Sequence, residues 1–386
     1  MVYVAWIVVL ILVANTLYLY LFSVAGWLMP RQAPKKAANE RGLDTLVLYP
    51  AYKEDEVIIQ SVKSFMAQRP AEHRYKLVVI ADALKEETLI TIQKFGAAVC
   101  RLPVSDKRNK ARAINYLLEH TAGSYDNCII MDADNTVEPD FIENMNRYFL
   151  GGAKVVQARR VAKNSSNSLS TLDTYSEIIN NHIFRKGQRA LGFSSSLIGS
   201  GMGFEFSLFK EVMQGMDVFS GFDKELELRL LERGIKMEYA EEVLVYDEKV
   251  AHHDVFVNQR RRWLYAQVYF LQKNFGKAIS KALHGNFDYA NKVLQFLLLP
   301  RVMCLGLAGI MLLVSAFLTP TMFVVTLIAN VLLAIALVLP LRFKTSLSAS
   351  ASAAMALPRV FINMGFALFT SGRASKRFLH TPHHSK

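Results

Sequence analysis

Short apolar runs alternate with amphipathic stretches between residues 45 and 161. The apolar runs have the length of buried strands, and the stretches between them repeat apolar residues at helical spacing. This alternation predicts an α/β fold, in which a mostly parallel sheet is covered by helices on both faces. The predicted strands are 45–52, 75–83, 97–104, 125–134 and 154–161, and the predicted helices are 55–69, 86–95, 110–120 and 139–150.

A longer apolar block opens the chain. Residues 2–28 carry no charged side chain, and basic residues follow at Arg31, Lys35, Lys36 and Arg41. A helix of this length crosses a bilayer core of roughly 30 Å. A signal peptide is the alternative, but its basic n-region and small-residue cleavage site are missing. We therefore predict an N-terminal transmembrane helix.

A second apolar block covers residues 293–341 and is interrupted by the uncharged pair Thr319-Pro320. This pair suits a tight turn between two spanning helices. Arg342 and Lys344 then follow, and basic residues mark the cytoplasmic end of a span. The pattern predicts a transmembrane hairpin, with the large polar region before it in the cytoplasm.

The remaining segment, residues 346–386, is apolar at first and contains Pro358-Arg359 in the middle of its apolar part. Basic flanks at both ends favour an interfacial or re-entrant helix over another span. The whole chain has a formal net charge of +12 at pH 7, and 52% of its residues are hydrophobic. Because the excess charge clusters at the membrane flanks, anionic lipids are a simpler partner than nucleic acid.

Acidic residues follow the predicted strands at the points where they end. Asp82 ends one strand, and Asp132 and Asp134 end another. Open α/β sheets bind ligands at the carboxyl edge of their strands, so we expect these side chains to share a site. A lone Asp at a strand end is often a cap, and Asp-x-Asp alone is a weak signal. Their occurrence on two strand ends strengthens the prediction.

The chemistry that fits such a site is the binding of a nucleotide diphosphate. Carboxylates hold an anionic diphosphate only through a bridging divalent cation, and Mg²⁺ or Mn²⁺ accepts carboxylate and phosphate oxygens. We predict that Asp134 ligates the metal and that Asp132 supports the metal or the ribose. Lys110, which opens a predicted helix, either adds positive charge near the phosphates or is a solvated surface residue.

A second polar motif, Gln259 to Trp263, contains three consecutive arginines and precedes an amphipathic basic helix. Apolar residues of this helix repeat at spacings of three and four, whereas Lys273, Lys277 and Lys281 lie on another face. Such a helix suits the cytoplasmic membrane surface. A lipid-facing arginine run with an interfacial Trp is the alternative interpretation of the motif.

In order and spacing, these motifs resemble those of the membrane-embedded family-2 glycosyltransferases, which include cellulose, chitin and hyaluronan synthases and the nodulation-factor chitooligosaccharide synthases. The resemblance covers nearly the whole chain. The residues that carry it are Pro50 to Tyr52, Asp82, Lys110 to Asn115, Asp132, Asp134, Val156 to Arg159 with Gln157, Gly199 to Gly203 with Gly201, Asp223, Gln259, Arg262, Trp263 and Leu379 to His383.

The resemblance implies a GT-A fold, a UDP-sugar donor and inversion at the anomeric carbon. It implies that Asp82 holds uracil and that Asp132 and Asp134 hold the diphosphate and the metal. Gln259 and Arg262 would line the nucleotide pocket, and Trp263 would stack on the acceptor sugar. Gln157, Gly201 and Lys110 are further candidate binding residues.

The resemblance also implies a catalytic base in a Glu-Asp element, from which this chain departs. Alignment from Arg233-Gly234 makes Asp223 the base, with Phe222 in place of Glu, and Glu225 is the rival. A base is required because the acceptor hydroxyl loses its proton as it attacks the sugar. For Glu227 and Arg229 we predict a solvated helix face instead.

The expected function is an inverting, metal-dependent transfer of GlcNAc or glucose from a UDP-sugar to a growing β-linked saccharide. The runner-up is a single transfer to a lipid acceptor, and a non-catalytic scaffold is the alternative from another class. The expected location is the inner membrane, with the catalytic domain in the cytoplasm. The sequence leaves open whether the protein forms a homo-oligomer. The predicted segments are 1–29, 30–255, 256–292, 293–345 and 346–386.

Overall fold

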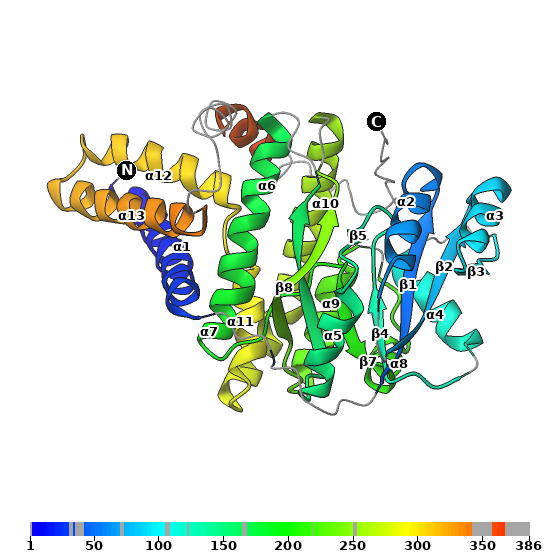
Figure 1. The fold of residues 1–386 in the computed structure, drawn as a ribbon. Coiled ribbons are helices and arrows are strands. Elements are labelled where there is room, and N and C mark those ends of the chain that lie inside the picture. The colour runs from blue at the N-terminus through cyan, green and yellow to red at the C-terminus, as the bar shows by residue number, and fades with distance from the viewer. Residues whose placement is uncertain are drawn as a thin grey trace.

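The computed structural model describes residues 2–30, 34, 42–69, 73–104, 109–121, 123–163, 168–218, 220–249, 253–341 and 357–366, with only the backbone for residues 253–256. Within these residues, one eight-stranded mixed sheet forms the centre of the molecule (Figure 1). Its strand order is β3-β2-β1-β4-β7-β6-β8-β5. Three apolar helices, α1 (Val2–Leu28), α12 (Arg301–Ser315) and α13 (Pro320–Val338), lie beside one another at one end (Figure 1).

The sheet contains both parallel and antiparallel pairs. Strand β1 pairs in parallel with β2 and β4, β2 with β3, and β6 with β8. The pairs β4–β7, β6–β7 and β5–β8 are antiparallel. The strands are β1 Asp44–Tyr52, β2 Arg74–Asp82, β3 Ala98–Arg101, β4 Asn127–Ile130, β5 Thr136–Val137, β6 Val155–Ala162, β7 Met202–Glu205 and β8 Glu238–Asp247.

Helices cover both faces of the sheet and bury two separate cores. One core packs β1, β2 and β4 against α2, α3 and α5, and the other packs them against α4, α8, α9, α10 and α11. The helices are α2 Asp55–Met66, α3 Glu86–Lys94, α4 Lys110–His120, α5 Phe141–Leu150, α6 Ser168–Asn180, α7 Gln188–Ala190, α8 Phe206–Met213, α9 Phe222–Glu232, α10 His253–Leu283 and α11 Phe287–Gln295, with a π-helix at Asn181–Gly187.

The sequence predicted strands β1, β2, β3, β4 and β6 and helices α2, α3, α4 and α5, with differences of a few residues at their ends. It did not predict β5, β7 or β8. Strand β5 has only two residues, and the four-residue β7 follows a glycine-rich loop, whereas the equally short β3 and β4 lie within longer predicted strands. The predicted α/β fold is confirmed, and the antiparallel pairs of β5 and β7 make the sheet mixed.

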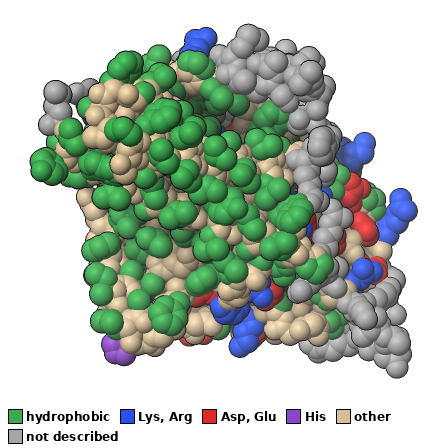
Figure 2. All heavy atoms as spheres, turned by 90° about the vertical axis from the view of Figure 1, so that its left-hand side faces the viewer, with side chains coloured by type: hydrophobic (Ala, Val, Ile, Leu, Met, Phe, Trp, Pro, Cys, Tyr) green, Lys and Arg blue, Asp and Glu red, His purple; other side chains and the backbone are tan. Residues whose placement is uncertain are grey.

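The apolar helices α1 (Val2–Leu28) and α13 (Pro320–Val338, continued by a short 3₁₀ turn to Leu341) are long and apolar enough to cross a membrane. Figure 2 shows hydrophobic side chains over most of the face that these helices present. Exposed hydrophobic residues of α1, α12 and α13 include Ile7, Leu10, Leu21, Leu313, Val324 and Val331. An apolar patch of this extent is typical of a surface that contacts lipid.

The predicted hairpin is only partly present in the described chain. Helix α13 begins at Pro320, and the Thr319 hydroxyl accepts a hydrogen bond from the amide of Met322, as the predicted turn requires. Helix α12 (Arg301–Ser315) has only 15 residues, and at 1.5 Å per residue it is too short to cross roughly 30 Å. Residues 31–33, 35–41, 342–356 and 367–386, with their predicted basic flanks and tail, lie outside the described residues.

The basic helix that follows the Gln259–Trp263 motif was expected to lie on the membrane surface. In the structure it is part of α10, which packs on the α/β domain. Helix α10 buries Ala266, Phe270 and Ala278 against the core and leaves Phe275 and Ile279 exposed. Its lysines do not form a free basic face. Lys273 pairs with Glu225 at 3.4 Å, and Lys277 and Lys281 both contact Glu232 of α9. These ion pairs attach α10 to the α/β domain.

Candidate functional site

The carboxyl ends of β1, β2 and β4 meet at one edge of the sheet. Tyr52 and Asp82 are register partners in the last position of β1 and β2. The next residues, Lys53 and Ala83, both have φ values of 56°, which non-glycine residues rarely adopt. Unusual backbone conformations of this kind concentrate at ligand sites. These conformations occur at the edge to which the strand-end rule points.

A cavity of about 310 Å³, here called cavity 1, opens at this edge. Asp82, Asp132 and Asp134 line it, as the sequence predicted. So do Lys110 and three residues of α10, namely Gln259, Arg262 and Trp263. The fold thus joins two motifs that lie more than a hundred residues apart in the sequence.

Asp132 and Asp134 occupy different environments within cavity 1. Lys110 donates from Nζ to Asp132 Oδ1 at 2.5 Å and to the Gly199 carbonyl at 2.6 Å, so it is not a surface lysine. Asp134 is 4% exposed and accepts hydrogen bonds from the Asn135 side chain and the Glu248 amide. Burial, followed by the charges of Asp247 and Asp132, raises the pKa of Asp134 well above its usual range.

The two carboxylates suit a divalent cation bound together with a diphosphate. A buried carboxylate whose pKa is raised by its neighbours gains stability when a cation binds beside it. Among the described residues, no group of three or more His, Cys, Asp or Glu side chains forms a complete metal cage. Mg²⁺-type sites commonly use one or two carboxylates and complete their coordination with substrate phosphates. Asp134 and Asp132 fit that arrangement.

A buried ion network lines part of cavity 1, and it was not predicted from the sequence. Glu177 of α6 pairs with Arg160 at 2.8 Å, Arg185 at 3.2 Å and Lys249 at 3.6 Å. Burial opposes the ionisation of Glu177, but these cations outweigh it and hold its pKa below the usual range. Asp247 pairs with Lys249 at 2.9 Å.

One sequence signal for this network existed. Asp247 ends strand β8, just as Asp82 ends β2, so the strand-end rule could have identified it had β8 been predicted. Glu177 and Asp173 lie on α6, and no local pattern distinguishes them from surface helix residues. Their role depends on how α6 packs over the sheet.

A larger adjoining cavity of about 580 Å³, here called cavity 2, contains Asp223. It shares Lys110, Asp132 and Trp263 with cavity 1. Asp223 lies in the first turn of α9, after Gly221, whose φ is 78°. A Cβ at Gly221 would lie 2.7 Å from the Phe270 ring, so glycine is required for α9 to begin here.

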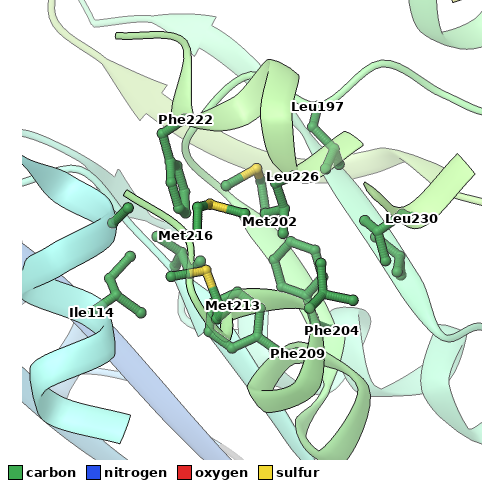
Figure 3. Packing of buried hydrophobic residues seen from close by; sticks show 14 of the residues in the cluster. Ile114, Leu197, Met202, Phe204, Phe209, Met213, Met216, Phe222, Leu226 and Leu230 are labelled. Atoms are coloured by element: carbon green, nitrogen blue, oxygen red, sulfur yellow. The ribbon is translucent and has the colours of Figure 1, made fainter. Parts of the chain in front are cut away.

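Phe222, which replaces the usual Glu of the family element, belongs to the hydrophobic core. Figure 3 shows Phe222, Leu226 and Leu230 of α9 packed in one cluster with Met202 and Phe204 of β7. An apolar residue at position 222 therefore anchors the start of α9. Asp223, the next residue, remains at the cavity.

Glu225, the rival base, lies on another side of α9. Its carboxylate pairs with Arg229 at 3.0 Å and with Lys273 at 3.4 Å, and it lines neither cavity. Two residues along a helix differ in direction by about 200°, so Asp223 and Glu225 cannot face the same space. We therefore retain Asp223 alone as the candidate base.

The prediction that Glu227 lies on a solvated face was wrong. Glu227 is 2% exposed and pairs with Lys292 of α11 at 2.7 Å. Being one helical turn after Asp223, it lies on the side of α9 that faces cavity 2, where Lys292 is a lining residue. Arg229 is half-buried and donates to the carbonyl of Val212. The buried pair joins α9 to α11.

Removing Lys292 should destabilise the protein strongly. Lys292→Met leaves the Glu227 charge buried without its cation, which costs about 3–5 kcal/mol. The double variant Glu227→Met/Lys292→Met should recover most of this loss, because apolar residues of similar volume often replace a buried pair well. Thermal unfolding of the full chain in detergent, followed by circular dichroism, measures both effects.

Lys277→Met provides the matched control. Lys277 pairs with Glu232 at 2.6 Å, but both side chains are about 40% exposed, at 43% and 40% respectively. Exposed pairs contribute about 0–1 kcal/mol, so the melting temperature should change little. Equal stability losses for Lys292→Met and Lys277→Met would contradict the special importance of the buried pair.

Gln157 and Gly201, both predicted to bind substrate, support a loop instead. The Gln157 side chain is fully buried, donates to the Ser200 carbonyl at 2.9 Å and accepts from the Ile198 amide at 3.1 Å. Gly201 has φ 61° and packs against Val245, which a Cβ would approach to 2.8 Å. Neither residue lines a described cavity. They position the loop whose Gly199 carbonyl binds Lys110.

The residues Gln259, Arg262 and Trp263 line both cavity 1 and cavity 2. Trp263 is 40% exposed, and the Arg260 guanidinium lies 4.3 Å from its ring centroid. An indole held in this way presents an apolar face suited to a sugar ring. This placement favours the binding interpretation of the motif over a purely lipid-facing one.

The family described as "Glycosyltransferase like family 2" matches residues 44–266. A curated relative, "Probable glycosyltransferase YdaM" of Bacillus subtilis (strain 168), is 24% identical over 260 residues. That match spans 63% of this chain and 60% of the relative, so it leaves two fifths of the relative's length uncovered.

The fold is shared with a solved structure, "Mannosyltransferase PcManGT from Pyrobaculum calidifontis in complex with GDP-Man and Mn2+". The TM-score is 0.58 at 16% identity, and the match covers 95% of this chain and 98% of the other. A glucosyl-3-phosphoglycerate synthase from Mycobacterium tuberculosis, in complex with Mn²⁺ and UDP-glucose, matches 56% of this chain and 75% of its own with a TM-score of 0.37. The GT-A type of fold is thereby confirmed from the first structure.

Proposed function

The chain belongs to glycosyltransferase-like family 2, and on this premise we propose that it transfers a sugar from a UDP-sugar to an acceptor hydroxyl at a membrane, with inversion. The single observation that carries the proposal is the composition of cavity 1. Three strand-end carboxylates and the Gln259–Trp263 motif line it together, and the candidate base lies in the adjoining cavity 2.

In this proposal the donor occupies cavity 1. Asp82 receives the uracil, and Asp134, with Asp132, holds a Mg²⁺ or Mn²⁺ ion on the diphosphate. The metal, when bound, neutralises the charge that develops on the leaving diphosphate. Lys110 adds a cation close to Asp132, and Arg262 and Gln259 bind the donor from the α10 side. The Mn²⁺ in the structure of the Pyrobaculum calidifontis mannosyltransferase supports this choice of cofactor.

The acceptor occupies cavity 2, beside Trp263. Its hydroxyl oxygen attacks the anomeric carbon on the face opposite the diphosphate, a C–O bond forms as the bond to the diphosphate breaks, and UDP leaves. Asp223 accepts the hydroxyl proton as general base. Attack from the opposite face converts an α-linked donor into a β-linked product.

We further propose that the protein lies in the cell inner membrane with the α/β domain in the cytoplasm. The two apolar helices α1 and α13 and the hydrophobic face that they form support a membrane location. The basic residues that follow α1 and α13 in the sequence support the cytoplasmic side for the domain.

Two acceptors are candidates. A growing β-linked saccharide, with GlcNAc or glucose as the transferred sugar, agrees with the motifs shared with polysaccharide synthases. A lipid acceptor is the second candidate, and a specific observation favours it. Cavity 2 adjoins a further, largely apolar cavity at the start of α12, which is described in the next subsection.

A donor screen tests the proposal. Purified full-length protein in detergent is incubated with Mn²⁺ and each of several UDP-sugars, with GDP-mannose for comparison. We expect UDP release and a β-linked product with one UDP-sugar, as measured by mass spectrometry and NMR. Products of several sugars would support the saccharide acceptor, and a single-sugar lipid adduct the lipid acceptor. Transfer from GDP-mannose alone would contradict the proposed donor.

A further inference from the structure

A third cavity, of about 250 Å³ and here called cavity 3, lies between α6, α10, the start of α12 and the helix at 357–366. It shares Trp263, Gln267 and Gln295 with cavity 2. One end of cavity 3 thus adjoins the space beside Asp223. Its other end is bordered by the first residues of an apolar helix, next to the candidate membrane spans.

Most of the lining of cavity 3 is apolar. Val302 of α12 and Val360 and Met364 of the 357–366 helix contribute to it. Met364 is 9% exposed and packs with Leu264 of α10 and Met303 of α12. The remaining apolar lining residues are Leu172, Phe184, Leu264, Leu298, Leu299 and Pro300. These walls suit a hydrocarbon chain better than a saccharide, because a saccharide needs hydrogen-bond partners.

Two arginines nevertheless lie in this cavity. The Arg260 guanidinium pairs with Asp173 at 2.5 Å, and both side chains are nearly buried, at 11% and 12% exposure. That pair is electrically neutral. Arg301 donates instead to neutral oxygens, from Nη1 to Asn180 Oδ1 at 2.8 Å and from Nη2 to the Ser176 hydroxyl at 2.7 Å. Among the residues that the structure describes, Arg301 forms no ion pair within 4.0 Å.

The charged residues that line cavity 3, Asp173, Arg260 and Arg301, therefore sum to one net positive charge. Arg301 is also the first residue of α12, so the first amide groups of this 15-residue helix point toward the same region without partners inside the helix. Guanidinium groups bind phosphate through two parallel hydrogen bonds. A cation in a mostly apolar cavity that adjoins both the proposed transfer site and an apolar helix fits an anionic amphiphile.

We propose that cavity 3 binds the anionic head group of a phosphate-linked lipid acceptor, with Arg301 as the residue that recognises the charge. The inference rests on the proposed function and specifies its acceptor. The lipid chain lies along α12 and the 357–366 helix, and the hydroxyl that receives the sugar lies in cavity 2, near Asp223. Arg301 is a binding residue here and takes no part in bond making.

Two matched amphiphiles test the proposal. Both carry an octyl chain and N-acetylglucosamine, joined in one by a phosphodiester and in the other by a neutral glycosidic bond. Full-length protein in detergent is titrated with each, without donor, and binding is followed by tryptophan fluorescence, since Trp263 lines the cavity. We expect the phosphate-linked compound to bind about tenfold more tightly, as one charge-assisted pair implies.

Variants at Arg301 show whether this residue recognises the charge of the phosphate or only maintains the shape of cavity 3. Arg301→Gln should reduce the tenfold ratio to about one, and Arg301→Lys should restore part of it because the charge remains. Arg233→Gln is the control, since Arg233 pairs with Glu211 on the surface, and it should retain the full ratio. A wild-type ratio of one, or an Arg301→Gln variant that weakens both compounds equally, would overturn the proposal.

Inorganic phosphate is the third arm of the experiment. If phosphate alone bound as tightly as the phosphate-linked lipid, the site would be one for free phosphate and the lipid proposal would be wrong. Because these titrations contain no donor, their result does not depend on UDP-sugar use. Failure of the donor screen would thus contradict the proposed function and leave the test of cavity 3 intact.

Discussion

Asp134→Ala is expected to lower metal-dependent UDP release by about a thousandfold or more, while the α/β domain remains folded. The Asp134 carboxylate is 4% exposed, lines cavity 1 and lies beside Asp132, so its removal deletes the buried oxygens that the metal needs. Metal stabilisation of a leaving group is worth several kcal/mol, which corresponds to this factor. A coupled assay of UDP release at increasing Mn²⁺ concentrations measures the effect.

Asp140→Ala is the matched control for this prediction. Asp140 is exposed, precedes α5, and makes no side-chain cap hydrogen bond there, so its loss should leave UDP release unchanged. Circular dichroism melting curves of both variants check that they fold. If Asp134→Ala kept its activity at saturating Mn²⁺, Asp134 would not be a metal ligand.

Asp223→Asn is expected to retain UDP binding and to lose sugar transfer by about 10²–10⁴-fold, the usual contribution of a general base. The amide keeps the size of the side chain at the start of α9 but cannot accept the proton of the acceptor hydroxyl. Transfer is measured as product formed per enzyme by mass spectrometry. UDP binding is measured separately by calorimetry in the presence of Mn²⁺.

Glu225→Gln tests the choice between the two acidic residues of α9. Its carboxylate binds Arg229 and Lys273 outside the cavities, so we expect a small loss of stability and no comparable loss of transfer. A Glu225→Gln variant without transfer activity, beside an active Asp223→Asn variant, would show that our assignment of the base is mistaken.

The alternation of apolar and polar positions was sufficient to predict the order of strands and helices as far as β6, apart from the two-residue strand β5. It was also sufficient to place Asp82, Asp132 and Asp134 at one edge, because parallel strands align their carboxyl ends. Both results depend on local sequence. Side-chain period and strand length are properties of a few consecutive residues.

The candidate site could be predicted only in part, because helices that pack over the sheet contribute some of its lining residues. Glu177 and Asp173 reach cavity 1 only because α6 lies over the carboxyl edge of the sheet. Gln157 and Gly201 lie at the positions that the family resemblance assigns to substrate binding. In the fold, however, Gln157 bonds the backbone of the loop that contains Gly199, and Gly201 packs against Val245. Whether a polar residue meets a ligand or a backbone group depends on neighbours that are far away in the sequence.

Helix α9 illustrates the same limit at the level of single residues. Asp223, Glu225 and Glu227 are equally acidic in the sequence, and a prediction from pattern alone had to choose among them. The rotation of α9 against the core directs Asp223 to cavity 2, pairs Glu225 with Arg229, and buries Glu227 against Lys292.

The sequence alone determines that this protein has an α/β domain with acidic strand ends and apolar flanking helices, because these features depend on the periodicity and charge of a few consecutive residues. The packing of α6, α9 and α10 on the sheet then selects which charged residues share a cavity. Lys292 meets Glu227 across 65 residues and Arg301 meets Ser176 across 125. Contacts at such separations arise from the geometry of the whole fold, which no local pattern contains.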